Sequence, residues 1–164
     1  MSWGRRPRSV RRLVLLVLGP CLLSLAALGC APSPTPTPPP SGGPAAEVVT
    51  LTNARRAAAG CAPVTAQGQL TLAAQLHADD MARHDYFSHT GRDGSLPWDR
   101  ARAMGYTGRT MGENIARGYQ TPQAVVEGWI NSPGHRANIE NCAYRHIGVG
   151  YDAATRTWVQ LFGG

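Results

Sequence analysis

The alternation of polar and hydrophobic positions divides the chain into segments of different character, and the first of them is not globular. Residues 1–12 contain five arginines and no acidic residue, and residues 13–28 are almost wholly apolar. A basic stretch, an apolar stretch and then a small residue before a cysteine, Gly29-Cys30, is the order found in signal peptides. Because the apolar stretch is shorter than the roughly 20 residues of a spanning helix, we predict that residues 1–29 are a cleaved signal peptide.

The next segment, residues 31–44, has no hydrophobic periodicity. It contains seven prolines separated by small and polar residues, a composition that favours extended polyproline II conformations and cannot bury a core. We predict a linker here. The regular hydrophobic patterns begin after it, so we place one globular domain at residues 46–164.

The first pattern in that domain predicts a helix over Glu47–Ala59. Val48, Leu51 and Thr52 share its inner face, and Gly60 is placed to end it. The same spacing turns Arg55 and Arg56 toward solvent.

Four more helices are predicted by spacing and by cap signals. The second covers Gly68–Asp85, with acidic and basic residues on its exposed side. Serine or threonine followed by proline is typical of a helix start, and helix starts of this kind are expected at Ser95 to Pro97, Thr121-Pro122 and Ser132-Pro133. In the last of these, the Ser132 hydroxyl is expected to accept an amide hydrogen bond as the N-cap.

Strand patterns occupy the end of the chain. Ile147, Val149 and Tyr151 alternate with glycines, and a second alternation runs from Trp158 to Phe162, which together predict a hairpin that turns between residues 152 and 157. Met111–Ala116 is a plausible third strand. This order predicts an α+β fold in which helices cover both sides of a small antiparallel sheet, with Trp98, Trp129 and Trp158 in the core.

Net charge argues against a nucleic-acid partner. The chain carries +6, from 16 basic and 10 acidic residues, but five of the arginines lie in the predicted signal peptide. Without them the net charge is +1, which provides no basic surface for a phosphate backbone.

The four cysteines have different predicted roles. Ala27-Leu28-Gly29-Cys30 resembles a bacterial lipobox, in which the cysteine is acylated and becomes the first residue of the mature protein. We expect Cys30 to anchor the chain to a membrane, and the alternative is ordinary cleavage that leaves Cys30 as an incidental thiol. With Cys21 in the signal peptide, Cys61 and Cys142 remain, and in an exported chain they are expected to form a disulfide. A catalytic thiol is the rival interpretation, but no histidine-rich neighbourhood surrounds either cysteine.

Spacing alone does not identify any chemistry. The histidines and acidic residues form none of the familiar metal-binding, catalytic-triad or phosphate-binding patterns. Five blocks are more informative, and they are Leu51–Arg56, Tyr86–His89, Gly112–Ala116, Trp129–Ile139 and Ile147–Tyr151. In order and identity they resemble the bacterial branch of the CAP superfamily, named for cysteine-rich secretory proteins, antigen 5 and pathogenesis-related proteins.

The resemblance implies an α-β-α sandwich with a cleft where a His-Glu-Glu-His tetrad gathers. Carried over by position, the members are His89, Glu113 and His135, while the second glutamate falls on Ser132. Two imidazoles and a carboxylate could hold a divalent metal such as zinc with an open coordination position, and the carboxylate would favour protonated imidazoles. The alternative is a hydrogen-bonded polar network with a structural role. In either case, Asn114 and Asn138 are expected to bridge the tetrad loops to the sheet rather than to contact a ligand.

We therefore expect a non-enzymatic, monomeric envelope or extracellular module. Its cleft residues His89, Glu113, His135 and Ser132 would bind a divalent metal, a small molecule, a lipid or another envelope component. One alternative is a metal-dependent or serine hydrolase that acts on peptides or cell-wall material, with Ser132 and His135 as a nucleophile pair. The other alternative is a stalked surface module that acts through protein contacts alone.

Overall fold

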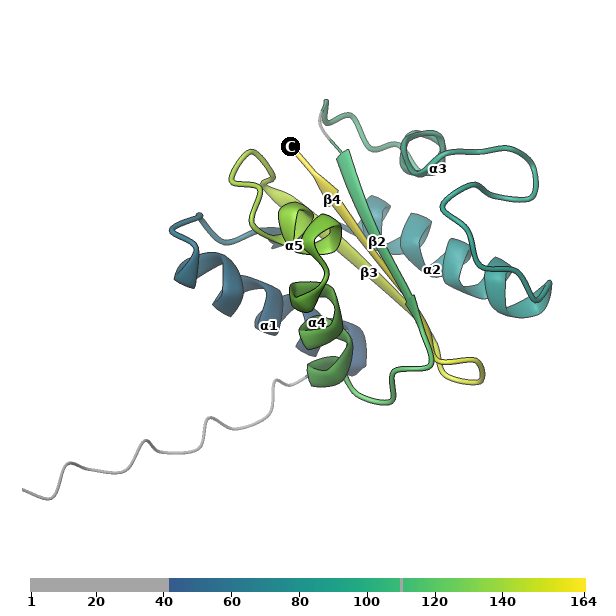
Figure 1. The fold of residues 1–164 in the computed structure, drawn as a ribbon. Coiled ribbons are helices and arrows are strands. Elements are labelled where there is room, and N and C mark those ends of the chain that lie inside the picture. Colours follow the sequence, from purple (N-terminus) through teal and green to yellow (C-terminus); the bar gives the residue numbers. More distant parts are fainter. Residues whose placement is uncertain (1–41, 110) are drawn as a thin grey trace, which may run out of the picture. The chain divides into compact units, whose positions relative to one another are not determined.

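The structure, a computed structural model, describes residues 42–109 and 111–164. The predicted signal peptide, Cys30 and most of the linker lie outside the described residues. Within them, three layers are visible, with a sheet between two groups of helices (Figure 1). None of the helices in the described part of the chain is long and apolar enough to span a membrane. The α-β-α sandwich expected from the family resemblance is confirmed.

The sheet has four strands in the order β1-β3-β4-β2. The predicted hairpin is formed by β3 (His146–Asp152) and β4 (Thr157–Gly163), and β2 (Met111–Arg117) pairs antiparallel with the other side of β4. No pattern in the sequence predicted β1 (Thr65–Ala66), which pairs in parallel with the start of β3. The expectation of a purely antiparallel sheet is therefore wrong. A two-residue strand has no periodicity of its own, and only its position beside β3 makes it a strand.

Five helices complete the fold, and the starts of all five were predicted within a few residues. They are α1 (Pro44–Ala58), α2 (Gly68–Arg83), α3 (Pro97–Ala103), α4 (Pro122–Asn131) and α5 (Pro133–Ile139). Thr121 caps α4 as expected, because its hydroxyl accepts the Ala124 amide at 3.1 Å. The Ser132 side chain makes no such bond at the start of α5, so that part of the prediction is wrong.

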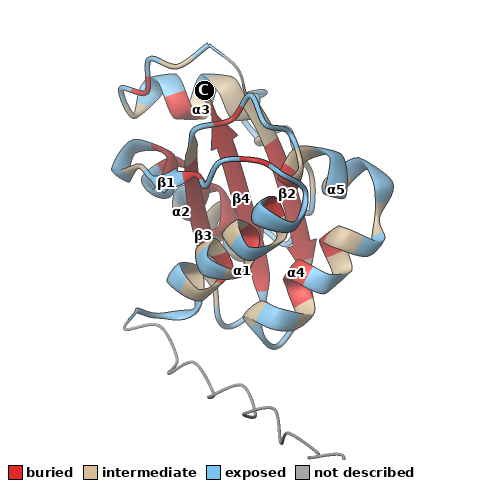
Figure 2. Cartoon of the chain, turned by 90° about the vertical axis from the view of Figure 1, so that its left-hand side faces the viewer, coloured by how far each residue is buried: buried red, intermediate tan, exposed pale blue. Residues whose placement is uncertain are grey.

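The sheet is buried on both faces, as Figure 2 shows by the red colour of β2, β3 and β4 between the helices. Side chains of β4 alternate between two cores. Trp158 and Phe162 pack with Trp129 on the side of α1, α4 and α5, while Val159 and Leu161 pack with α2 and α3. Every residue of β4 is buried, so this central strand is the framework on which the rest is assembled.

Two glycines of β3 let α2 lie directly on the sheet. A Cβ atom at Gly148 would lie 2.1 Å from the carbonyl carbon of Leu70, and one at Gly150 would lie 2.4 Å from that of Ala74. Real Cβ atoms do not approach backbone so closely, so only glycine permits this contact. The glycines that alternate with apolar residues in β3 are therefore a packing requirement of the helix above them.

The disulfide between Cys61 and Cys142 is confirmed, with 5.0 Å between the two Cα atoms. It joins the end of α1 to the loop between α5 and β3. Arg56 reaches the same region. Its guanidinium donates to the carbonyl oxygens of four residues on both sides of the disulfide, which are Ala62, Ile139, Asn141 and Tyr144.

The prediction that Arg56 faces solvent is wrong, because the residue is fully buried. Helical spacing places Arg56 one turn from Thr52, on the inner face of α1, where an apolar side chain is expected. The buried guanidinium of Arg56 is satisfied there by hydrogen bonds to backbone carbonyl groups. Arg55 does remain partly exposed and pairs with Glu140. Burial, and then the charge of Arg145, lowers the pKa of Arg56.

The tryptophan predictions hold in two of three cases. Trp129 and Trp158 are buried in the core. Trp98 is only half-buried near the start of α3, where the guanidinium of Arg102 lies 4.3 Å from its ring centre. The short helix α3 lies at the edge of the molecule and has no second layer above it. The Trp98 ring is therefore covered by the Arg102 guanidinium and not by core side chains.

Candidate functional site

Two of the family-derived residues meet across the sheet edge. His89 lies in the loop between α2 and α3, and its Nδ1 lies 2.7 Å from Oε1 of Glu113 on β2. The Glu113 side chain is 2 % exposed, whereas that of His89 is 52 % exposed. The Glu113 carboxylate is therefore fixed and buried. The His89 ring contacts this carboxylate through Nδ1 and is otherwise largely exposed to solvent.

A residue that sequence reasoning missed completes this pair. Nη2 of Arg100, on α3, lies 2.7 Å from Oε2 of Glu113, so each carboxylate oxygen has its own partner. Nη1 of Arg100 also donates to the His89 carbonyl oxygen at 3.0 Å and to that of Ser95 at 2.8 Å. No motif marks Arg100 in the sequence, because its role depends on how the loop before α3 folds back over β2.

The loop that carries His89 is held through its backbone carbonyl groups. His77 on α2 is buried, and its Nε2 donates to the Ser88 carbonyl at 2.9 Å, while Arg117 donates to that of Tyr86. Burial first, and then the charge of Arg100, lowers the pKa of His77, which keeps the ring neutral at pH 7. Three donors, on α2, α3 and β2, thus fix the position of His89.

The backbone of His135 is tied to β2 by a chain of side-chain amides. Asn114 follows Glu113 on β2, and its Nδ2 donates to the His135 carbonyl oxygen at 3.1 Å and to Oε1 of Gln160 at 2.9 Å. Asn138 on α5 donates to the Glu113 carbonyl oxygen and to Oδ1 of Asn114. The prediction that Asn114 and Asn138 connect the tetrad segments to the sheet is confirmed. The chain continues from Gln160 to the Thr52 hydroxyl on α1, at 2.8 Å.

The electrostatics of His135 differ from the expectation. A carboxylate between two imidazoles was expected to favour their protonated forms, but the pKa of His135 is lowered, first by burial and then by the charge of His89. The prediction is wrong for His135 because Glu113 directs its oxygens to His89 and Arg100.

Ser132 does not join the group through any hydrogen bond among the described residues. Together with Tyr119, Glu127, Gly128 and Asn131, it lines a shallow depression beside α4. The nucleophile pair of Ser132 and His135 requires a hydrogen bond between them, which the described part of the chain does not contain.

The possible metal ligands of the candidate site are few. In the described ranges, no three His, Cys, Asp or Glu side chains are grouped as metal ligands. Because Nδ1 of His89 is bonded to Glu113, its Nε2 is free to bind, and Glu113 takes the place of the carboxylate that orients a metal-binding histidine. His89 and His135 are the residues that would hold a metal, with Glu113 behind His89.

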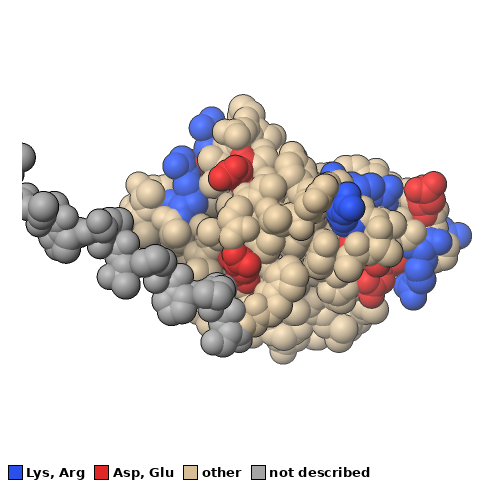
Figure 3. Space-filling view, turned by 90° about the horizontal axis from the view of Figure 1, so that it is seen from below, with Lys and Arg blue, Asp and Glu red and all other residues tan. Residues whose placement is uncertain are grey.

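Charged side chains elsewhere are mixed in sign. On the face seen in Figure 3, acidic and basic side chains lie near one another rather than in separate patches.

Comparison with known proteins places these features in a family. The model of the "CAP: Cysteine-rich secretory protein family" matches residues 49–162. The uncharacterized protein YkwD of Bacillus subtilis is 42 % identical over 116 residues, which are 71 % of this chain and 45 % of that protein. The uncharacterized membrane protein YlbC of the same bacterium is 39 % identical over 107 residues, 65 % of this chain and 31 % of that protein.

Among solved structures, an extracellular protein containing a SCP domain from Bacillus anthracis superposes with a TM-score of 0.70 at 31 % identity, covering 74 % of this chain and 40 % of that one. The chain thus spans less than half the length of each of these relatives. The matched region contains every helix and strand described above except the start of α1 and the last residue of β4. This chain therefore belongs to the CAP family of cysteine-rich secretory proteins.

Proposed function

We propose that this protein is an exported, non-enzymatic binding module whose His89–Glu113–His135 site holds a divalent metal ion such as zinc. The observation that carries the proposal is the short contact between His89 Nδ1 and Glu113, with Glu113 held in turn by Arg100. This arrangement orients the exposed ring of His89 with Nε2 directed away from the carboxylate. A bound metal would have open positions for water or an external ligand.

Replacing His135 with alanine is expected to abolish zinc binding, measured by calorimetry on protein purified without a histidine tag. His89→Ala should do the same, while Glu113→Gln should weaken binding about tenfold because it acts through the orientation of His89. His84→Ala is the matched control, since His84 is an exposed histidine that pairs only with Asp80. Equal zinc affinity in the wild type and in His135→Ala would show that the site is structural.

Zinc affinity should also depend on pH. Protons compete with a metal for an imidazole below the ordinary histidine pKa of about 6.5. Because the pKa of His135 is lowered, this ring stays neutral, and able to bind, to a lower pH than an ordinary histidine. We expect affinity to be constant above about pH 6.5, to remain so somewhat below it, and to fall at lower pH. A zinc affinity that does not change down to pH 5 would contradict histidine ligation.

We also propose that the chain is exported and tethered through an acylated Cys30. Support comes from the leader and lipobox pattern, and from relatives described as an extracellular protein and as a membrane protein. The wild-type protein, expressed in its own envelope, should partition into the detergent phase of a Triton X-114 extraction. Cys30→Ser should appear in the aqueous phase or remain uncleaved, whereas Cys21→Ser should behave as the wild type. Identical partitioning of Cys30→Ser and wild type would exclude the anchor.

A further inference from the structure

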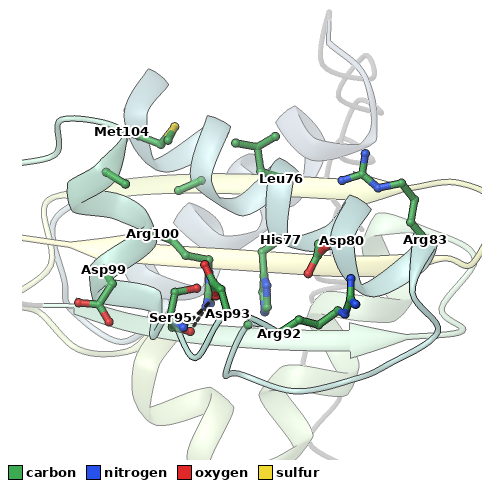
Figure 4. A pocket seen from close by; sticks show the side chains of 13 residues that line it. Leu76, His77, Asp80, Arg83, Arg92, Asp93, Ser95, Asp99, Arg100 and Met104 are labelled. Carbon is green, nitrogen blue, oxygen red and sulfur yellow. Dashed lines mark hydrogen bonds between the residues drawn. The ribbon is translucent and has the colours of Figure 1, made fainter.

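A cavity of about 620 Å³ lies between α2, the loop of residues 91–95 and α3. It is separate from the exposed ring of His89, although Arg100 and His77 contribute to both. One wall is apolar and consists of Ala73, Leu76, Ala103 and Met104. Figure 4 shows Leu76 and Met104 along one side of the cavity and Asp93, Ser95 and Arg92 along the other. Leu76 is 45 % exposed, an apolar surface that a ligand could cover.

The polar side contains three aspartates, and the protein itself uses all of them. Asp80 accepts a hydrogen bond from the Tyr86 hydroxyl at 2.5 Å and pairs with His84. Asp93 accepts the Ser95 amide at 2.9 Å, and Asp99 accepts the Leu96 amide at 3.0 Å. Each of these carboxylates therefore stabilises the local fold through at least one of its oxygens.

The three arginines of the cavity leave several of their hydrogen-bond donors without a partner in the described ranges. Arg83 and Arg92 are exposed, and in residues 42–109 and 111–164 their side chains make no hydrogen bond or ion pair. Arg100 is 11 % exposed and engaged through both terminal nitrogens, but its Nε is buried without a hydrogen-bond partner in the same ranges. Arg83 and Arg92 are thus the charged side chains of the cavity that have no partner in the described ranges, and an anionic ligand would supply acceptors for them.

We propose that this cavity binds a small amphipathic anion, a carboxylate or phosphate monoester on a short aliphatic body. The head group pairs with the guanidinium groups of Arg83 and Arg92. The aliphatic body covers Leu76 and Met104. Binding here needs no metal and does not depend on the histidine–glutamate site.

The test uses the full mature chain with ¹³C-labelled methionine methyl groups and four probes that share a six-carbon body, which are hexanoate, hexyl phosphate, hexanol and hexylamine. Hexanoate should bind with a Kd on the order of 1–10 mM, as expected for so few atoms. It should shift the methyl signal of Met104 while that of the buried Met81 stays in place. The double variant Arg83→Gln with Arg92→Gln should weaken hexanoate binding about tenfold, and Leu76→Ser should also weaken it.

Arg136→Gln is the matched control, since Arg136 is an exposed arginine on α5, across the sheet from α2. Hexanol and hexylamine should bind at least about fivefold more weakly than hexanoate, because neither supplies an anion. Tighter binding of hexyl phosphate than of hexanoate would assign the head group as phosphate, and the reverse would assign it as carboxylate. The proposal is overturned if no probe shifts Met104, if hexanol or hexylamine binds as tightly as both anions, or if the double variant binds hexanoate like the wild type.

Discussion

Replacing Arg56 with methionine is expected to lower the free energy of unfolding by about 4 kcal/mol. The methionine side chain fills a similar volume, but it leaves the carbonyl oxygens of Ala62, Ile139, Asn141 and Tyr144 without the donors that Arg56 supplies. Each unsatisfied buried acceptor costs about 1–3 kcal/mol, and partial relaxation toward water reduces the sum. Urea unfolding followed by tryptophan fluorescence measures the change.

Arg55→Met is the matched control, because it removes the same kind of side chain one position earlier in α1. Among the described residues, Arg55 pairs with Glu140 alone, and both side chains are partly exposed. Exposed ion pairs contribute about 1 kcal/mol or less, so this variant should lie close to the wild type. Equal destabilisation of the two variants would mean that the carbonyl bonds of Arg56 contribute little.

Replacing Cys61 and Cys142 together with alanine is expected to cost about 4 kcal/mol. The bond joins residues 81 positions apart, and in the chain-entropy model a loop of this length raises the free energy of the unfolded chain by that amount. The native contacts change little, since both alanines fit where the cysteines were. The double variant should therefore keep the far-UV circular dichroism of the wild type and unfold at a lower urea concentration.

A reducing agent separates the disulfide from other effects of these substitutions. Dithiothreitol should shift the unfolding midpoint of the wild type toward that of the double variant and leave the double variant unchanged. A wild type whose midpoint does not respond to complete reduction would contradict the predicted stabilisation. Mass spectrometry of protein from its native envelope should find both cysteines bonded, and two free thiols there would exclude a role for the bond in the cell.

The proposed metal site and the amphipathic-anion cavity share Arg100, which has consequences for mutagenesis. Its terminal nitrogens hold Glu113 and the carbonyl of His89, and its side chain forms part of the cavity wall. A substitution of Arg100 would disturb both at once. Variants of Arg83, Arg92 and Leu76 test ligand binding in the cavity alone. Variants of His89 and His135 test metal binding alone.

Local patterns in the sequence determined most of the elements of this fold. Cap signals such as Thr121-Pro122, the alternation in Ile147–Tyr151 and the periodicity of Gly68–Arg83 each act within a few residues, so they could be interpreted without a structure. The pairing of Cys61 with Cys142 followed by elimination in an exported chain. His89, Glu113 and His135 came from the order of the family blocks, because no spacing rule connects them.

Tertiary structure alone decided which polar residues are buried and what they contact. Arg55 and Arg56 are adjacent and chemically identical, yet only Arg56 faces carbonyl groups that α5 and the following loop bring to it. Arg100 has a role because the segment before α3 lies over β2, and β1 is a strand only because β3 runs beside it. In each case the partner is distant in sequence. Burial and hydrogen bonding at these positions depend on a surface supplied by another element, and a local pattern contains no information about that surface.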